Sequence, residues 1–423
     1  MTRILFYRVI PIIVVFLSAN LLVGQDKDLS LNEAISIALQ NNPELLAAQL
    51  EVDARQARIA QAGARPNPEL IIVTEDISGS GRFEGFDSSQ TTAQLSQRFE
   101  LGGKRAARRD AASLNRDVAE ADLELKRREI AAKVRKSFFA VLLSQEQVRV
   151  MQDLSEVSKR FSGVVIERIQ AGKIPPIDEV KAQAIVALAE IELTRSTRAL
   201  ESARYELAAV LGASELEFHS VRGDLPQGSD VGLALLMQSL PVEVKKAEIE
   251  IEQSKALLAI EKSKPVPDLT VSGGYRRLET TDDSAFVVGV SLPLPLFDRN
   301  KGAIEEAQKR IRKAEQTKSS VLLNARTSLS KSFQSYSAAR LEAESLRTLV
   351  VPANQTSFEA ISEGYRLGKY GYLDVLEAQR SLFQSRLQLL RALGDIYASA
   401  AEIERITGKE ILLADQSKEV QDE

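Results

Sequence analysis

The feature of this sequence that most restricts its fold is a set of long runs without glycine or proline. The longest covers residues 104–162, which are 59 residues, and two more cover residues 179–211 and 303–351. One continuous helix over the first run would extend about 90 Å, at about 1.5 Å per residue. Such long helices need partner helices along their length. The runs therefore predict a mainly α protein built from long coiled-coil rods.

Two segments between these runs have the pattern of β-hairpins. Each contains two runs of roughly ten residues around a turn rich in Gly, Ser, Asp or Thr, and prolines mark the changes from helix to strand. In the first hairpin Leu95 and Phe99 alternate with Gln94 and Arg98. This alternation predicts strands with one apolar face. The apolar residues that recur at every other position of the second hairpin are Phe286, Val288, Val290 and Leu292.

The chain carries the same short segment twice, half a chain apart. Residues 170–183 read QAGKIPPIDEVKAQ and residues 366–379 read RLGKYGYLDVLEAQ, so Gly172 and Asp178 recur 196 positions later as Gly368 and Asp374. The order of helix, Pro-x-Pro, hairpin, long helix, Gly-Lys turn and helix is the same in both halves. We therefore predict an internal duplication. Its parts are a first repeat at residues 25–212, a linker at 213–230, a second repeat at 231–410 and a frayed tail at 411–423.

The N-terminus has the composition of an export signal. Arg3 and Arg8 lie at the start, and residues 9–24 carry no charge. A basic start, an apolar stretch and small residues near Ala19 and Gly24 are typical of a cleaved secretory signal, which we place at residues 1–24. A retained membrane anchor is the alternative, although the apolar run is shorter than the roughly 20 residues that span a bilayer.

The composition argues against several classes of function. The chain has no cysteine and its single histidine is His219, which leaves little for a metal site or thiol chemistry. With 55 basic and 59 acidic residues the net charge is −4, which gives no sign of nucleic-acid binding. We recognise no phosphate-binding loop and no catalytic carboxylate pair. We therefore expect no enzyme, no catalytic residue, no cofactor, no metal ligand and no nucleic acid partner.

Strands of about ten alternating residues match the tilted strands of a membrane β-barrel. A sheet in lipid must close on itself because unpaired edges are not tolerated there, and the smallest such barrels have about eight strands. Two hairpins give four strands per chain, so two chains would supply eight and three would supply twelve. Three chains are more compatible with an open lumen. The competing interpretation is a soluble rod whose hairpins pack against its own helices.

The sequence resembles that of a known family. The start LSLNEAISIALQNNPELLAAQ, the two hairpins and the two GK…D…AQ turns are similar to those of the TolC-type outer-membrane efflux channels. FELGGKRAARR further resembles the branch that works with heavy-metal exporters of the Czc and Cus type. The resemblance implies a homotrimer in the cell outer membrane, with a 12-stranded β-barrel in the lipid and a large periplasmic coiled-coil α-barrel. It also implies a periplasmic membrane-fusion adaptor and an inner-membrane resistance-nodulation-division pump.

The resemblance places the two repeated turns at the periplasmic tip, where the inner helices narrow the tube to a gate. The gate residues that it assigns are Asp178, Tyr365, Asp374 and Glu377, and the internal repeat adds Lys181 as a further candidate. It implies a contact between Tyr365 and Asp374, and Lys181 aligns with Glu377 across the repeat, so these two could form an ion pair. Three inward copies of Asp374 would make an acidic ring that favours cations. Alternatively, these charges are a solvated helix face whose ion pairs contribute little.

The same tips are the expected docking site for the adaptor. The candidates are Gly172, Lys173, Gly368, Lys369 and Tyr370. Aromatic residues are enriched at contact surfaces, although packing within the tip is the alternative for the tyrosines.

Two classes of function remain open from the sequence. The first is a trimeric exit channel of a tripartite efflux system that passively conducts substrates, either heavy-metal cations or the cargo of drug export or type I protein secretion. The second is a non-conducting periplasmic coiled-coil structural or adaptor protein. The two differ in whether the hairpins enter lipid.

Overall fold

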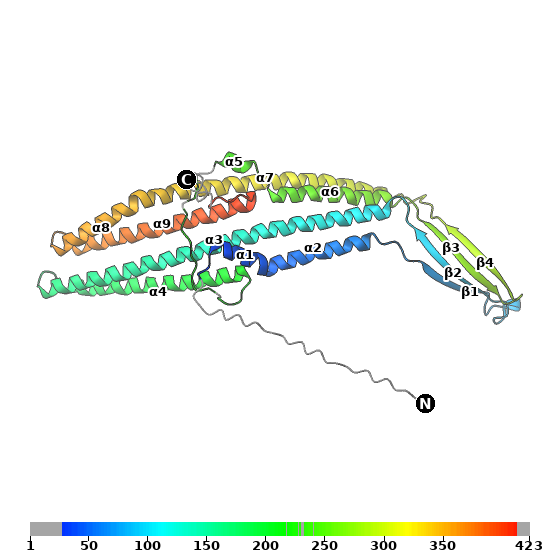
Figure 1. The fold of residues 1–423 in the computed structure, drawn as a ribbon, viewed down its shortest axis with the longest axis horizontal. Coiled ribbons are helices and arrows are strands. Elements are labelled where there is room, and N and C mark those ends of the chain that lie inside the picture. Colours follow the sequence, from blue (N-terminus) through cyan, green and yellow to red (C-terminus); the bar gives the residue numbers. More distant parts are fainter. Residues whose placement is uncertain (1–27, 217, 227, 230–231, 240, 413–423) are drawn as a thin grey trace, which may run out of the picture.

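The structure, a computed structural model, describes residues 28–216, 218–226, 228–229, 232–239 and 241–412. The predicted signal peptide at residues 1–24 lies outside the described residues. Long helices run side by side along one axis and a small sheet lies at one end of them (Figure 1). The helical turns between α3 and α4 and between α8 and α9 lie at the opposite end (Figure 1).

The elements follow the same order in the two halves of the chain. The first half contains α1 (Leu31–Asn41), α2 (Pro43–Ala62), β1 (Glu69–Glu75), a short 3-10 turn (Gly81–Phe83), β2 (Gln90–Phe99), α3 (Lys104–Gln170) and α4 (Ile177–Leu211). The second half contains α5 (Leu233–Met237), α6 (Val242–Ser263), β3 (Leu269–Leu278), β4 (Asp283–Ser291), α7 (Lys301–Ser345), a π-helical segment (Leu346–Val350), α8 (Val351–Arg366) and α9 (Tyr372–Thr407).

The predicted long helices are confirmed, and they are longer than the runs without glycine or proline. Helix α3 has 67 residues, which corresponds to about 100 Å. It passes through Gly163, because one glycine in a helix costs only about 1 kcal/mol relative to alanine. Its counterpart in the second half continues past Pro352 by way of the π-helical segment. Pro352 has no N–H for the carbonyl four residues earlier, and the widened turn accommodates that loss.

The two predicted hairpins join into one antiparallel sheet in the order β1-β2-β3-β4. Strands β2 and β3, from different halves of the chain, pair over their full length from Gln90↔Leu278 to Phe99↔Leu269. Strands β1 and β4 are therefore the two edges of this sheet, and within the described residues each pairs with one strand.

The sheet has one apolar face and one polar face, as the alternation predicts. One row across it joins Leu70, Leu95, Gly273 and Val288, and the three larger residues are 69%, 56% and 80% exposed. On the other face Arg276 donates to the Thr92 hydroxyl at 2.9 Å. A large apolar surface is thus left uncovered at this end of the molecule.

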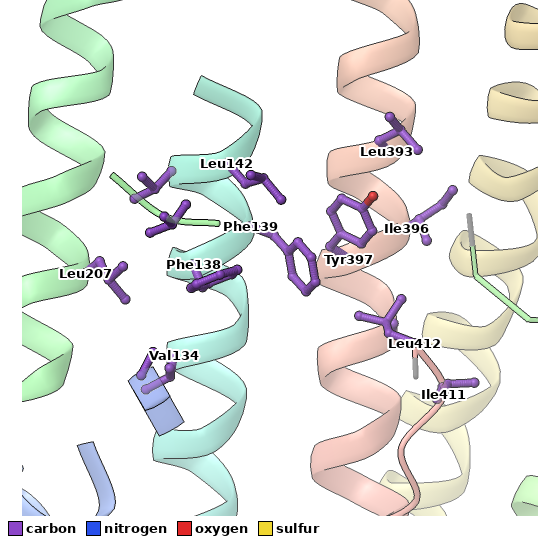
Figure 2. Close-up of a cluster of buried hydrophobic side chains, with 14 of the residues drawn as sticks. Val134, Phe138, Phe139, Leu142, Leu207, Leu393, Ile396, Tyr397, Ile411 and Leu412 are labelled. Carbon is purple, nitrogen blue, oxygen red and sulfur yellow. The ribbon is translucent and has the colours of Figure 1, made fainter. Parts of the chain in front are cut away.

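The main core lies near the middle of the helices, where α1, α3, α4, α7 and α9 meet. The rings of Phe139 on α3 and Tyr397 on α9 stack with centroids 4.1 Å apart, with Phe138 beside them (Figure 2). Leu207 on α4 is fully buried in the same cluster.

The chain after α9 corrects one prediction. The frayed tail expected at residues 411–423 does not include Ile411 and Leu412, which are 2% and 4% exposed and belong to the core (Figure 2). The Glu404 carboxylate accepts the backbone N–H of Ile411 at 2.7 Å and that of Leu412 at 3.3 Å. Arg135 on α3 lies 3.1 Å from the same carboxylate. Residues 413–423 lie outside the described residues.

Candidate functional site: the helical tip and the sheet

The first repeated turn closes helix α3 with a glycine in the left-handed region. Gly172 has φ 69°, which favours glycine because a Cβ is strained there. Its N–H donates to the carbonyl of Ile169 at 2.8 Å, and the N–H of Lys173 donates to the carbonyl of Arg168 at 2.9 Å. These two bonds form a Schellman motif, which satisfies carbonyls at the end of a helix.

The second repeated turn has the same geometry. Gly368 has φ 80°, and its N–H donates to the carbonyl of Tyr365 at 2.9 Å. The N–H of Lys369 donates to the carbonyl of Gly364 at 2.8 Å. The repeated Gly-Lys pair therefore builds the same sharp reversal at the end of both long helices.

The two turns pack against each other through one small core. It contains Val165, Ala182, Tyr365, Tyr372 and Val375, so it draws on both helical hairpins. The ring of Phe161 lies between the two tyrosines, with centroids 5.0 Å from Tyr365 and 5.6 Å from Tyr372. Tyr365 is only 1% exposed.

Arg168, a residue that the sequence analysis missed, connects the two hairpins. Its Nη1 donates to the carbonyl of Tyr365 at 2.5 Å, and its guanidinium lies 4.3 Å from the centroid of the Tyr365 ring. Comparison of the two repeats could have singled out Arg168, because the equivalent position 196 residues later is Gly364. A Cβ on Gly364 would overlap the ring of Tyr370. One copy thus has an arginine that reaches across, and the other has a glycine that makes room for an aromatic ring.

The predicted contact between Tyr365 and Asp374 does not form within this chain. The Tyr365 hydroxyl has no hydrogen-bond partner among the described residues. Burial raises the pKa of Tyr365, and the nearby Asp178 carboxylate raises it further while Arg168 opposes this. Asp374 is exposed and accepts the N–H of Gly371 at 2.7 Å, so it caps the start of α9. That cap satisfies a free N–H at the helix N-terminus.

The suggested ion pair between Lys181 and Glu377 does not form within the chain either. Lys181 lies 2.9 Å from Asp178, three residues earlier on α4. The Asp178 side chain is 15% exposed, which places it next to the tip core, whereas Glu377 is exposed.

The five docking candidates form the outer surface of the tip. Lys173 and Lys369 are exposed beside their glycines, and Tyr370 is 48% exposed. An open groove of about 880 Å³ between α3, α4 and α9 begins at Leu373, three residues after Tyr370, and extends along the helices. Its apolar lining residues include Leu154, Leu188, Leu373, Leu376 and Leu387.

Comparison with known proteins identifies the family to which this arrangement of long helical hairpins and a four-stranded sheet belongs. The family model of the outer membrane efflux protein matches residues 34–213 and 240–409. The cobalt-zinc-cadmium resistance protein CzcC of Cupriavidus metallidurans is 38% identical over 388 residues, which cover 90% of each protein. The nickel and cobalt resistance protein CnrC of the same organism is 28% identical and aligns over 67% of this chain and 68% of its own length.

A solved structure agrees with the family match. The crystal structure of CusC superposes with a TM-score of 0.72 at 18% identity, over 88% of this chain and 91% of that one. The chain belongs to the outer membrane efflux protein family of TolC-type channels.

The family resemblance seen in the sequence is thereby confirmed. The chain is an outer membrane efflux protein with a large helical periplasmic portion, and its family consists of channels rather than enzymes. In the part of the chain that the structure describes, no helix combines the length and the apolar composition that crossing a bilayer requires.

Proposed function

We propose that this protein is a homotrimeric exit channel that passively conducts substrates out of a tripartite efflux system. The observation that carries the proposal is the two-faced sheet with two open edges. Among the described residues, strands β1 and β4 each lack a second neighbouring strand, and a sheet edge in lipid must be paired. Joining the β4 edge of one copy to the β1 edge of the next closes a ring, and three copies give 12 strands around a lumen. The polar face of the sheet then lines that lumen.

The trimer is testable with engineered disulfides, because the natural chain has no cysteine. We would place Val287→Cys on β4 and scan cysteines along β1, from Leu70 to Val73, in the same chain. A pair in register brings the two Cβ atoms to about 4 Å, which permits a disulfide. We expect a covalent trimer on a denaturing gel for one or two of the pairs. Single-cysteine variants serve as controls, and covalent dimers without trimers would contradict a three-membered ring.

We propose that the two repeats, residues 25–212 and 231–410, give each chain two helical hairpins of the tube, joined by residues 213–230. In this proposal the tip is the gate. The link from Arg168 to Tyr365 holds one hairpin of a chain against the other. Asp374 adds an exposed carboxylate from each chain, and three such carboxylates in a narrow opening favour cations. Asp178, Lys181 and Glu377 lie on the same tip and contribute to its charge.

We propose that a periplasmic membrane-fusion adaptor docks on the tip at Gly172, Lys173, Gly368, Lys369 and Tyr370. The exposed lysines and the apolar groove that begins at Leu373 support this, because helix-in-groove binding combines apolar contact with a polar rim. An inner-membrane pump of the resistance-nodulation-division class then supplies the energy, and the channel itself uses none.

Heavy-metal cations are the proposed substrates. The support is the 38% identity to CzcC over nearly the whole chain and the match to CnrC, both named for metal resistance. Drugs or secreted proteins are the alternative cargo for this family.

Growth on metal salts tests the substrate class. A strain without this gene should grow poorly on cobalt, zinc or cadmium salts and recover with the plasmid-borne gene. Unchanged metal tolerance with a newly acquired sensitivity to organic drugs would assign the channel to drug export.

A further inference from the structure

One exposed surface at the junction of sheet and helices is not explained by conduction or by docking at the tip. After β4 ends at Ser291, every residue from 291 to 299 is exposed. Leu294, Leu296 and Phe297 are 69%, 63% and 98% exposed. Side chains of this size gain free energy when they leave water, so a run of them points to a binding partner. We call residues 292–297 the junction segment.

The backbone of the junction segment is suited to an apolar environment. Pro293 and Pro295 have no N–H, and the N–H of Leu296 donates to the carbonyl of Leu294 at 2.9 Å in a γ-turn. Three of its six residues therefore present no free N–H. Non-sheet backbone is tolerated near hydrocarbon only when its polar groups are accounted for in this way.

The junction segment continues the apolar face of the sheet. Val288 and Val290 lie on that face and are 80% and 69% exposed. Leu292, Leu294 and Leu296 extend the same every-other-residue pattern beyond the last strand residue. The exposed apolar band is thus longer than the strand itself.

Two cations, Arg299 and Lys301, follow the junction segment after Asp298. Arg299 and Lys301 are exposed and form no ion pair within the part of the chain that the structure describes. The neighbouring Asp298 carboxylate accepts the N–H of Asn300 at 2.9 Å. The Asn300 side-chain amide donates to the backbone carbonyl and the carboxylate of Glu261 on α6, both at 2.8 Å. The cations are therefore held at a fixed height just beyond the apolar residues.

The first hairpin leaves the sheet with the same order of residue types. Phe99 and Leu101 are 50% and 42% exposed. Arg105 and Arg109 then follow on the first turns of α3, and both are exposed. Each chain thus carries two apolar segments, each followed by cations at the start of a long helix.

We propose that these junctions bind the periplasmic leaflet of the outer membrane and fix the depth of the barrel in it. Leu294, Leu296 and Phe297 insert among the acyl chains, and Arg299 and Lys301 bind the phosphates of acidic phospholipids. An apolar and aromatic band bordered by cations is the arrangement that residues adopt at a membrane interface. The inference rests on the proposed membrane barrel.

A second copy of the chain is a poorer partner for this surface than lipid. In a ring, the segment leading into the neighbour's β1 would approach the junction segment. Residues 64–69 carry one cation, Arg65, and one anion, Glu69, so they offer no net negative charge to match Arg299 and Lys301. Phosphate groups of a lipid leaflet supply that charge.

Tryptophan fluorescence tests the apolar part, because the natural chain has no tryptophan. Phe297→Trp, Phe286→Trp and Leu367→Trp would each be reconstituted in phosphatidylethanolamine–phosphatidylglycerol vesicles whose acyl chains are brominated. Phe286 is 88% exposed on the sheet and reports the barrel. Leu367 directly follows α8, in the turn to α9 at the end of the molecule opposite the sheet (Figure 1), and should not be quenched. We expect Trp emission to be quenched at position 297, more by bromines near the ester than by bromines near the methyl end.

The two reporters separate the possible failures. Quenching at position 286 without quenching at position 297 would overturn the proposed lipid contact but remain consistent with the membrane barrel. That result is expected if a neighbouring copy covers the junction segment. Absence of quenching at both positions contradicts the membrane barrel itself, and the inference falls with it.

The cations are tested by the lipid that remains bound to the purified protein. Arg299→Gln with Lys301→Gln should lower the enrichment of phosphatidylglycerol over phosphatidylethanolamine, with the remainder due to Arg105 and Arg109 of the first junction. Arg326→Gln with Lys331→Gln, exposed cations roughly 40 Å further along α7, should leave the enrichment unchanged. Equal enrichment in the wild type and both double variants would refute the phosphate contact.

Discussion

Arg168→Ala is the sharpest test of the proposed gate. The guanidinium makes two interactions across the tip, a hydrogen bond of 2.5 Å to the Tyr365 carbonyl and a cation–π contact of 4.3 Å to its ring. A charge-assisted hydrogen bond contributes about 1.5–3 kcal/mol, and a partly desolvated cation–π contact about 1–2 kcal/mol. Because the two interactions share one side chain they do not add fully, and we take about 3 kcal/mol for the pair.

A loss of that size shifts the equilibrium between joined and separated hairpins by roughly 100-fold. Single-channel recording in planar bilayers should therefore show a large increase in open probability for Arg168→Ala. Arg168→Lys keeps the charge but not the planar group, so it should be intermediate. Arg366→Ala is the matched control, because Arg366 lies at the same tip but pairs with Glu363 on its own helix, and these side chains are 66% and 55% exposed.

The outcome that would refute this reasoning is an Arg168→Ala channel that opens no more often than Arg366→Ala while both assemble normally. The link between the hairpins would then be a packing contact that the gate does not have to break.

Three further predictions follow from the structure. Asp374→Asn keeps a side-chain cap for α9 but removes the negative charge. The preference of the channel for cations, measured by reversal potentials, should therefore fall while assembly is unchanged. An unchanged cation preference would show that Asp374 does not line the opening. Glu404→Ala leaves the buried N–H groups of Ile411 and Leu412 without their acceptor and removes one of the two carboxylates that pair with Arg135, the other being Glu410. It should lower the free energy of unfolding by about 3–5 kcal/mol in denaturation experiments. A loss below about 1 kcal/mol would contradict the role of Glu404. Lys173→Glu with Lys369→Glu should abolish efflux in cells while leaving the conductance of the purified channel intact; surviving efflux would exclude the two lysines from docking.

Glu404 also predicts a pH dependence. Burial raises its pKa from the ordinary value of 4.5, against the opposing effects of Arg135 and the two N–H groups. The folded chain therefore binds this proton at a higher pH than the unfolded chain does. Its contribution to stability is fully present below the ordinary pKa and is lost as the pH rises through the folded one. In Glu404→Gln, thermal unfolding should no longer show this component, and an unchanged pH profile would contradict the shift.

Much of the architecture was predictable because it depends on local rules. Runs without glycine or proline marked the long helices, alternation marked both faces of the sheet, and the Gly-Lys pair marked the two turns. The helix through Pro352 was not predictable, since a proline in the middle of a helix usually ends or kinks it. The pairing of β2 with β3 was not predictable either, because alternation fixes a face but not the neighbouring strand.

The sequence predicted which residues lie at the helical tip, but not which of them contact one another. The sequence placed Tyr365, Asp374 and Asp178 together, and all three do lie at the tip. Their partners differ from the expected ones, because Tyr365 packs under Arg168 and Asp374 caps its own helix. A sequence motif fixes the spacing of residues along the chain. The contact between Arg168 and Tyr365 joins two hairpins and residues 197 positions apart, so a motif does not predict it.

The conductance of the purified wild-type oligomer in a planar bilayer tests the central claim most directly. A trimeric exit channel with an acidic opening should give small, long-lived steps that prefer cations over anions. Absence of conductance, together with release of the protein from cells by a salt wash alone, would mean that the sheet does not enter lipid, and would contradict the account.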